Sequence, residues 1–136
     1  MSMNTYASDD YGLLLDDEDI VYIAKRIDQD APNEPPIIWE LMDEIESYTG
    51  CVFISEFCGE AIGISDEGEY DYSVTTGFRG ETVYFIPFKR YPTLLSAAYK
   101  NLDEIISEVR QRTIQYLPPN FDYRNRLRHI VGTYIG

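Results

Sequence analysis

Hydrophobic residues recur at helical spacing near the start of the chain. After the apolar run at residues 13–15, Asp16 or Asp17 is placed to cap a first helix, and the acids that follow suit the positive end of its dipole. The apolar positions of this segment follow the i, i+3, i+4, i+7 pattern of a helix with one buried face. They are Ile20, Ile23, Ala24 and Ile27.

Two further helices are expected from the same spacing. One begins near Pro36 and ends at Gly50, because proline suits a first helical position and glycine a helix end. Its buried stripe would be Ile38, Leu41, Met42 and Ile45. The other runs from Pro92 to about Tyr116 and stops before Pro118-Pro119. Its apolar seam would be Leu95, Ala98, Leu102, Ile105 and Val109.

Between the second and third helices the hydrophobic period changes to two, which is typical of strands. Gly59, Asp66-Glu67-Gly68 and Gly77–Gly80 punctuate this region. The four short strands expected are Cys51–Phe57, Glu60–Ser65, Tyr70–Thr76 and Thr82–Phe88. Connections this short favour an antiparallel meander.

The C-terminal tail fits two kinds of structure. Residues 123–129 suit one or two helical turns, whereas residues 130–135 look more like a strand. The whole pattern predicts a single α+β domain over residues 1–136. In it, an antiparallel β-meander of about four strands packs against two or three helices.

The net charge of the chain is unusual for a small domain. The chain has 136 residues and a formal net charge of −13, while about 2–8 charges are enough to keep a small domain soluble. Residues 1–75 hold 19 acidic and 2 basic side chains, and residues 76–136 hold 5 acidic and 9 basic ones. Such an acidic surface repels phosphate, so we expect a basic partner and no direct binding of DNA.

Candidate catalytic and metal-binding chemistry is sparse. Cys51, Cys58 and His129 match no zinc pattern, and the two thiols are expected to be reduced. The run Asp16-Asp17-Glu18-Asp19 lacks the ligand order and glycine of a calcium loop. No apolar run reaches the length of a membrane span, and no secretory signal precedes the first helix. We therefore expect a cytoplasmic protein that is not an enzyme, with no cofactor and no membrane contact.

The second helix concentrates carboxylates on its outer stripe. Glu40, Asp43 and Glu44 lie there with Glu46 nearby, and the predicted helix has no lysine or arginine. Glu40 and Glu44 form an i, i+4 pair of like charge, which costs an isolated helix roughly 0.2–0.5 kcal/mol. This stripe is either a solvated face or a binding surface.

A second acidic stretch lies at residues 66–72. If its latter half is extended, Glu67, Glu69 and Asp71 project on one side with a spacing of about 6.8 Å. That spacing resembles the regular negative charge of a nucleic-acid backbone. Tyr70 and Tyr72 would supply rigid contact area of the kind found at interfaces. The alternative is a solvated hairpin tip whose tyrosines pack on the sheet.

Size, charge and aromatic content together resemble the small acidic proteins of phages and mobile elements that imitate DNA. Anti-CRISPR inhibitors of type II effector nucleases are the closest kind. The runs at residues 9–17 and 128–134 are similar to segments of phage-type proteins. Members of this group present carboxylates to the basic cleft that reads the short DNA motif beside the target. The chain departs from a uniformly acidic mimic at Arg124, Arg126 and Arg128, which would suit RNA or a second chain.

The resemblance implies an inhibitor that occupies the DNA-binding cleft of a nuclease in a bacterial host. The alternative is an immunity protein that neutralises a basic toxin nuclease, and an enzyme or a structural phage component is a third reading. The partner-binding residues that we expect are Asp16, Asp17, Asp19, Glu40, Asp43, Glu44, Glu67, Glu69, Tyr70, Asp71 and Tyr72.

Overall fold

Four antiparallel strands and three helices make up the part of the chain that the computed structural model describes, residues 5–34, 40–88 and 102–135. The prediction of an α+β fold with about four antiparallel strands is therefore confirmed. The strands are β1 (Thr5–Leu15), β2 (Val52–Ile64), β3 (Tyr70–Pro87) and β4 (Leu127–Ile135). The helices are α1 (Asp17–Ile27), α2 (Met42–Thr49) and α4 (Leu102–Thr113), with a 3-10 turn, η4, at Arg124–Arg126.

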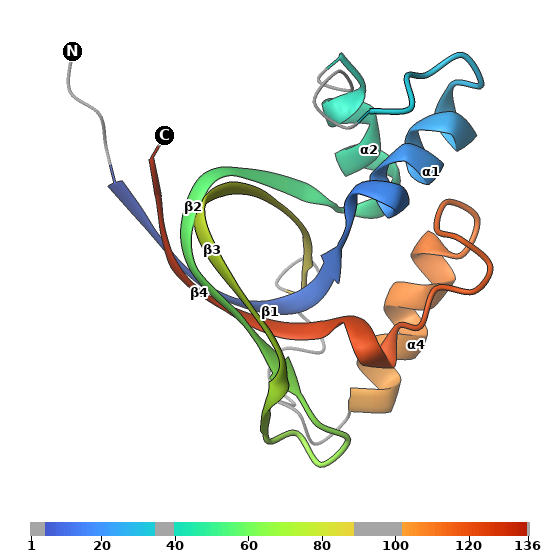
Figure 1. The fold of residues 1–136 in the computed structure, drawn as a ribbon. Helices are drawn as coiled ribbons and strands as arrows, with labels where there is room; N and C mark the ends of the chain where they lie inside the picture. Colours follow the sequence, from blue (N-terminus) through green and yellow to red (C-terminus); the bar gives the residue numbers. More distant parts are fainter. Residues whose placement is uncertain (1–4, 35–39, 89–101, 136) are drawn as a thin grey trace.

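The strands close into a small barrel in the order β1-β3-β2-β4, because β1 pairs with both β3 and β4. The β1–β4 pairing runs from Thr5 opposite Ile135 to Leu13 opposite Leu127, so the first and the last described strands lie side by side. Figure 1 shows the three helices gathered on one side of this barrel. Of the connections expected for a meander, only the β2–β3 hairpin joins neighbouring strands, so the meander order is wrong.

Strand β1 is the element that the sequence pattern missed. Ser8, Asp9, Asp10 and Gly12 have low strand propensity, and only the run at residues 13–15 stands out as apolar. The strand forms because β4 pairs with it along nearly its whole length. Pairing partners that lie more than a hundred residues apart leave no local signal in the sequence.

The four short strands predicted between residues 51 and 88 are two long, bent strands. Glu56 has a φ of 52° where the β2–β3 register shifts between Ile54 and Phe57. This is a β-bulge, which bends a strand without ending it. Gly59 lies inside β2 and Gly77 inside β3, so neither glycine is the strand break that the sequence suggested.

The first helix begins and buries its face as the pattern predicts. Asp16 is the N-cap of α1, and Ile20, Ile23 and Ala24 are fully buried while Ile27 is half-buried. The described part of the chain thus decides between the two candidate caps in favour of Asp16.

The other two predicted helices are seen in part. Ile45 is buried in α2, Leu41 and Met42 are half-buried, and Gly50 ends the helix in the left-handed conformation with a φ of 79°. The predicted start at Pro36 and its neighbour Ile38 lie outside the described residues.

In α4, Ile105 and Val109 are buried as expected. The helix ends at Thr113, before Tyr116, and Leu95 and Ala98 lie outside the described residues. Residues 130–135 belong to a strand, as predicted, and that strand already starts at Leu127.

Two hydrophobic clusters hold these elements together. The smaller one comes from the strands alone and is the core of the barrel itself; its buried members are Phe57, Ala61, Val83, Phe85 and Ile130. The larger one combines residues of β1 and the end of β3 with the buried faces of all three helices. The helices therefore cover one part of the barrel and leave the outer surface of other strand segments in solvent.

Candidate acidic interaction surface

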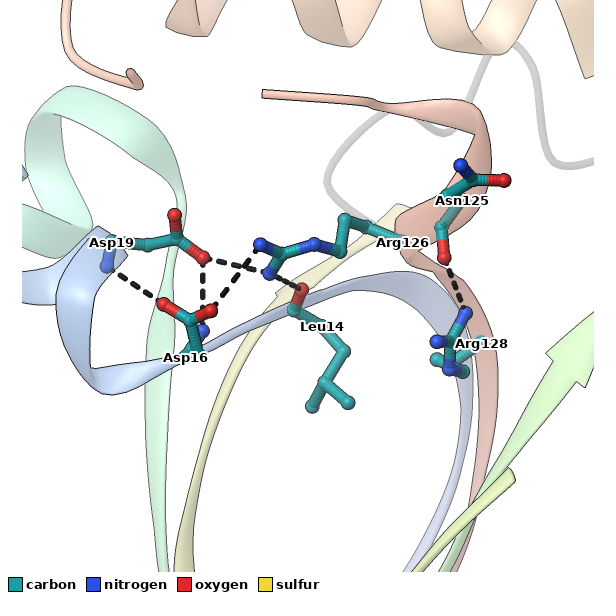
Figure 2. Close-up of polar contacts among 6 residues, drawn as sticks. All are labelled: Leu14, Asp16, Asp19, Asn125, Arg126 and Arg128. Atoms are coloured by element: carbon teal, nitrogen blue, oxygen red, sulfur yellow. Dashed lines mark hydrogen bonds and ion pairs between the residues drawn. The ribbon is translucent and has the colours of Figure 1, made fainter. Parts of the chain in front are cut away.

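Asp16 and Asp19 take part in the structure of the α1 N-terminus. Each carboxylate accepts a hydrogen bond of 2.9 Å from the backbone N–H of the other residue, which is the reciprocal arrangement of a capping box. Arg126 donates to Asp19 at 2.7 Å, to Asp16 at 3.3 Å and to the carbonyl of Leu14 at 3.2 Å (Figure 2). These two predicted site residues are thus engaged with the fold.

Burial sets the electrostatics of this network. The Asp19 side chain is only 6% exposed, whereas that of Asp16 is 54% exposed. Burial raises the pKa of Asp19, and the bonds from the Asp16 backbone and from Arg126 oppose that rise. The third predicted acid of this turn, Asp17, is exposed. Its negative charge acts on the neighbouring Tyr84: burial of Tyr84, reinforced by the charge of Asp17, raises the pKa of the Tyr84 hydroxyl to about 12.

The other two arginines of the basic tail also have partners within the chain. Arg124 forms ion pairs with Asp66 of the β2–β3 turn, at 3.5 Å, and with Asp103 at the start of α4. Arg128 donates to the carbonyls of Asn125 and Leu127, both at 2.7 Å; the bond to Asn125 is drawn in Figure 2. Burial lowers the pKa of the Arg128 guanidinium. Two of the three tail arginines, Arg124 and Arg126, therefore pair with acids of the N-terminal half.

The carboxylates at the start of α2 are exposed. Glu40 lies in the 3-10 turn before the helix, and Asp43 and Glu44 lie in its first turn. Among the described residues, none of the three forms an ion pair. Asp43 and Glu44 gain some stability from the helix dipole, but nothing cationic that the structure describes neutralises them.

The acids of the β2–β3 turn are arranged differently from the expected extended row. Residues 65–69 form a turn in which the backbone N–H of Ser65 donates to the carbonyl of Glu69, so Glu67 lies in a turn and not in a strand. The prediction that Glu67, Glu69 and Asp71 form a regularly spaced row on one strand is therefore wrong, because β3 begins only at Tyr70. Glu67 and Glu69 are nevertheless exposed at the tip of the hairpin.

Asp71 and its tyrosine neighbours begin strand β3. Ser73 donates to Asp71 Oδ1 from its hydroxyl at 2.5 Å and from its backbone at 3.1 Å, and these bonds lower the pKa of Asp71. The rings of Tyr70 and Tyr72 meet edge to face at 6.0 Å, and they are 45% and 67% exposed. Both rings are accessible to a partner, and their role at an interface stays a prediction.

Apart from Asp16, Asp17 and Asp19 at the start of α1, the expected site residues form two groups rather than one surface. Figure 1 shows α2 and the β2–β3 turn at opposite ends of the molecule, joined by the length of β2. The group around α2 contains Glu40, Asp43 and Glu44, and the group around the turn contains Glu67, Glu69, Asp71 and the two tyrosines. Arg124 pairs with both Asp66 of the β2–β3 turn and Asp103 of α4, so Asp103 lies near the group around the turn.

A cluster around His129 was not foreseen from the sequence. His129 Nε2 lies 2.5 Å from Asp9 Oδ1, and its Nδ1 lies 2.8 Å from the Tyr70 hydroxyl. The Tyr11 ring stacks on the imidazole with centroids 4.0 Å apart. Tyr11 and His129 are register partners on β1 and β4, so only knowledge of the unpredicted strand β1 would have brought them together.

The cysteines lie apart from this cluster. Cys51 is buried and Cys58 is exposed, and both partners of the His129 ring nitrogens are oxygen atoms. A cavity of about 380 Å³ between the first halves of β1 and β2 is lined by residues that include Ser8, Ile54 and Phe85, and by neither cysteine nor His129. Within the described residues, no group of three or more histidine, cysteine or acidic side chains is placed to hold a metal ion.

Comparisons with known proteins add no family to these observations. The sequence matches no protein-family model, and it has no significant match among curated proteins or solved structures. Among the described helices, none is both long enough and apolar enough to cross a bilayer. The class that fold and surface define is an acidic α+β protein with a closed four-stranded barrel and two exposed groups of carboxylates.

Proposed function

We propose that the protein is a DNA-mimicking inhibitor that binds the basic nucleic-acid-binding cleft of a nuclease and blocks DNA sterically. The single observation that carries this proposal is the exposure of five carboxylates that form no ion pair among the described residues: Glu40, Asp43, Glu44, Glu67 and Glu69. A cleft that attracts phosphates attracts such carboxylates for the same electrostatic reason. The nuclease that fits the proposal best is a type II CRISPR effector.

The distribution of charge supports a binding role over a merely solvated surface. All 24 carboxylates belong to described residues, as do eight of the eleven lysines and arginines. Three of these arginines are held in contacts with carboxylates or carbonyls of the chain itself. The remaining exposed acids repel one another, which a fold selected only for stability would avoid.

The two carboxylate groups lie in different parts of the molecule. Glu40, Asp43 and Glu44 lie at one end of the molecule and Glu67 and Glu69 at the other (Figure 1). Because the two groups share no residue, their contributions to binding are separable by mutation. The experiment therefore tests them separately.

Two neutralised variants identify the group that binds. Each removes exposed charges while preserving side-chain shape: Glu40→Gln with Asp43→Asn and Glu44→Gln, and Glu67→Gln with Glu69→Gln and Asp71→Asn. Inhibition of DNA cleavage by a type II effector nuclease is measured for each, with melting temperature as the check on folding. We expect one variant to lose inhibition, with binding weaker by ~1–3 kcal/mol for each charge-assisted bond lost.

A matched control removes the same number of charges from outside both groups. Glu56 on β2, Glu81 on β3 and Glu104 on α4 are exposed, and their change to glutamine makes the net charge less negative by the same amount. If this control variant loses as much inhibition as the others, only overall charge matters. If all three variants inhibit normally, the proposed mimic surface is wrong. Inhibition of a toxin nuclease alone would point to an immunity protein.

A further inference from the structure

The outer face of the barrel carries a row of three exposed residues from three strands. Asp9 on β1 is the register partner of Val131 on β4, and Val131 is the partner of Glu60 on β2. Directly paired residues project to the same side of a sheet, and neighbouring strands lie about 4.8 Å apart. Two carboxylates about 10 Å apart thus flank Val131, whose side chain is 41% exposed.

The orientation of Asp9 is fixed by the neighbouring row. Its Oδ1 lies 2.5 Å from His129 Nε2, and the histidine is only 7% exposed because Tyr11 stacks on its ring. With a hydrogen on Nε2 directed to the carboxylate, Nδ1 accepts the hydrogen bond of the Tyr70 hydroxyl, at 2.8 Å. The Asp9 side chain itself is 78% exposed, and within the described residues its Oδ2 accepts no hydrogen bond. Asp9 is therefore a preorganised acceptor with one oxygen directed to solvent.

Two aromatic rings border the same face. Tyr70 reaches the face through its bond to His129, and Tyr72 packs against Tyr70 with its own ring 67% exposed. Tyrosine rings bury much area at little cost in side-chain entropy, and their faces attract cations. The face therefore combines ordered carboxylate, apolar side chain and exposed aromatic ring, and none of the described helices covers it.

We propose that this face, formed by Asp9, Glu60, Tyr70, Tyr72 and Val131, binds an arginine-bearing segment of a protein partner. A guanidinium group is planar, pairs with a carboxylate through parallel hydrogen bonds and stacks on aromatic rings. A lysine ammonium is compact and strongly hydrated, and it gains less from the tyrosines and from Val131. The net charge of −13 complements a basic partner and opposes a nucleic acid.

This inference extends the proposed function, because it adds a face whose Asp9, Glu60 and Val131 belong to neither group of carboxylates described above. It does not depend on a nuclease as the target. Its test uses peptides as probes, so its failure and the failure of the inhibition experiment are distinguishable.

The test titrates the full-length, ¹⁵N-labelled protein with a hexa-arginine peptide and with the hexalysine peptide of equal charge. We expect the arginine peptide to bind several-fold more tightly and to shift the amide resonances of Glu60, Tyr72 and Val131. Equal affinity for the two peptides would mean that only net charge is recognised. Resonance shifts confined to α2, or no binding, would also overturn the proposal.

Variants assign the effect to the face. Asp9→Asn retains an oxygen acceptor for His129, and combined with Glu60→Gln it should weaken arginine-peptide binding roughly fivefold. Tyr72→Ala should weaken it by a similar factor. The charge-matched control, Glu104→Gln with Glu108→Gln on the exposed side of α4, should change the affinity less than twofold, and an equal loss in the control would contradict the assignment. The melting temperature of each variant shows that the fold is intact.

Discussion

At the scale of single residues, the same side-chain chemistry serves two purposes according to burial. Asp19 and Arg126 meet at the junction of β1, α1 and η4. Asp19 accepts hydrogen bonds from the Asp16 backbone and from Arg126, which also donates to the carbonyl of Leu14. Glu67 and Glu69 sit in solvent at a hairpin tip. Carboxylates counted equally in the sequence are thus structural at one position and available for binding at another.

Replacing Arg126 by alanine should destabilise the fold substantially. The change removes the counterion of Asp19, whose side chain is 6% exposed, together with the stacking of the guanidinium on Phe121. Leaving a buried charge unpaired costs about 3 kcal/mol or more. Urea unfolding measures the loss in the free energy of unfolding.

The matched control for that change is Arg124→Ala. The carboxylates that pair with Arg124 are 78% and 87% exposed, and such surface pairs contribute about 1 kcal/mol or less. Equal losses in the free energy of unfolding for Arg124→Ala and Arg126→Ala would show that the burial of Asp19 does not strengthen its pairing with Arg126.

Ser73→Ala should raise the pKa of Asp71 toward the ordinary value. The Ser73 hydroxyl is the larger of the two Ser73 contributions that lower this pKa, and alanine removes it while the backbone bond remains. Because the folded-state pKa is depressed, the contribution of Asp71 to stability is present above the ordinary pKa of 3.8 and is lost as pH falls through the folded value. A carbon-detected NMR titration of the carboxyl group measures the change, and an unchanged titration curve would refute the assigned cause.

At the scale of elements, the close approach of two strands leaves room only for glycine where they touch. A Cβ at Gly132 of β4 would lie 2.3 Å from the carbonyl oxygen of Cys58 and 2.9 Å from Cα of Gly59 on β2. Two glycines facing each other therefore let β2 and β4 come together and close the barrel.

Gly132→Ala should accordingly destabilise the barrel by about 1–3 kcal/mol through overpacking. Gly77 on β3 is the matched control, since a Cβ there has no neighbour within 4 Å and no left-handed φ is involved. Differential scanning calorimetry should show a lower melting temperature for Gly132→Ala and little change for Gly77→Ala. A tolerated Gly132→Ala would mean that the β2–β4 contact relaxes freely.

At the scale of the whole molecule, long-range charge controls how fast a partner is found. With a net charge of −13, attraction to a basic cleft acts over the Debye length, about 8 Å at physiological ionic strength. The partner's cleft and the two carboxylate groups attract each other before any contact forms.

The association rate with a basic nuclease should therefore fall steeply from low to moderate salt, while the dissociation rate changes less. Stopped-flow or surface-based kinetics at several salt concentrations measure both rates. The variant neutralised at Glu40, Asp43 and Glu44 or the one neutralised at the hairpin should show a shallower dependence of the association rate. An association rate that is flat over this range would exclude electrostatic steering.

The sequence by itself determined the elements whose signals are local. The capped, amphipathic helix α1, the end of α2 at Gly50, the strand-rich middle and the strand at residues 130–135 all follow from spacing, capping and turn residues. Composition also determined that most carboxylates face solvent, because a chain with a net charge of −13 cannot bury or pair them all.

Only the tertiary structure decided the rest. Barrel closure needs β1, whose polar residues give no strand pattern and whose partner β4 is distant in sequence. The same closure places Tyr11 against His129 and Asp9 in line with Val131, and it sets the two carboxylate groups at opposite ends of the molecule (Figure 1). Strand pairing is a contact between distant segments, and a local pattern specifies which face of a strand is apolar but not which strand lies beside it.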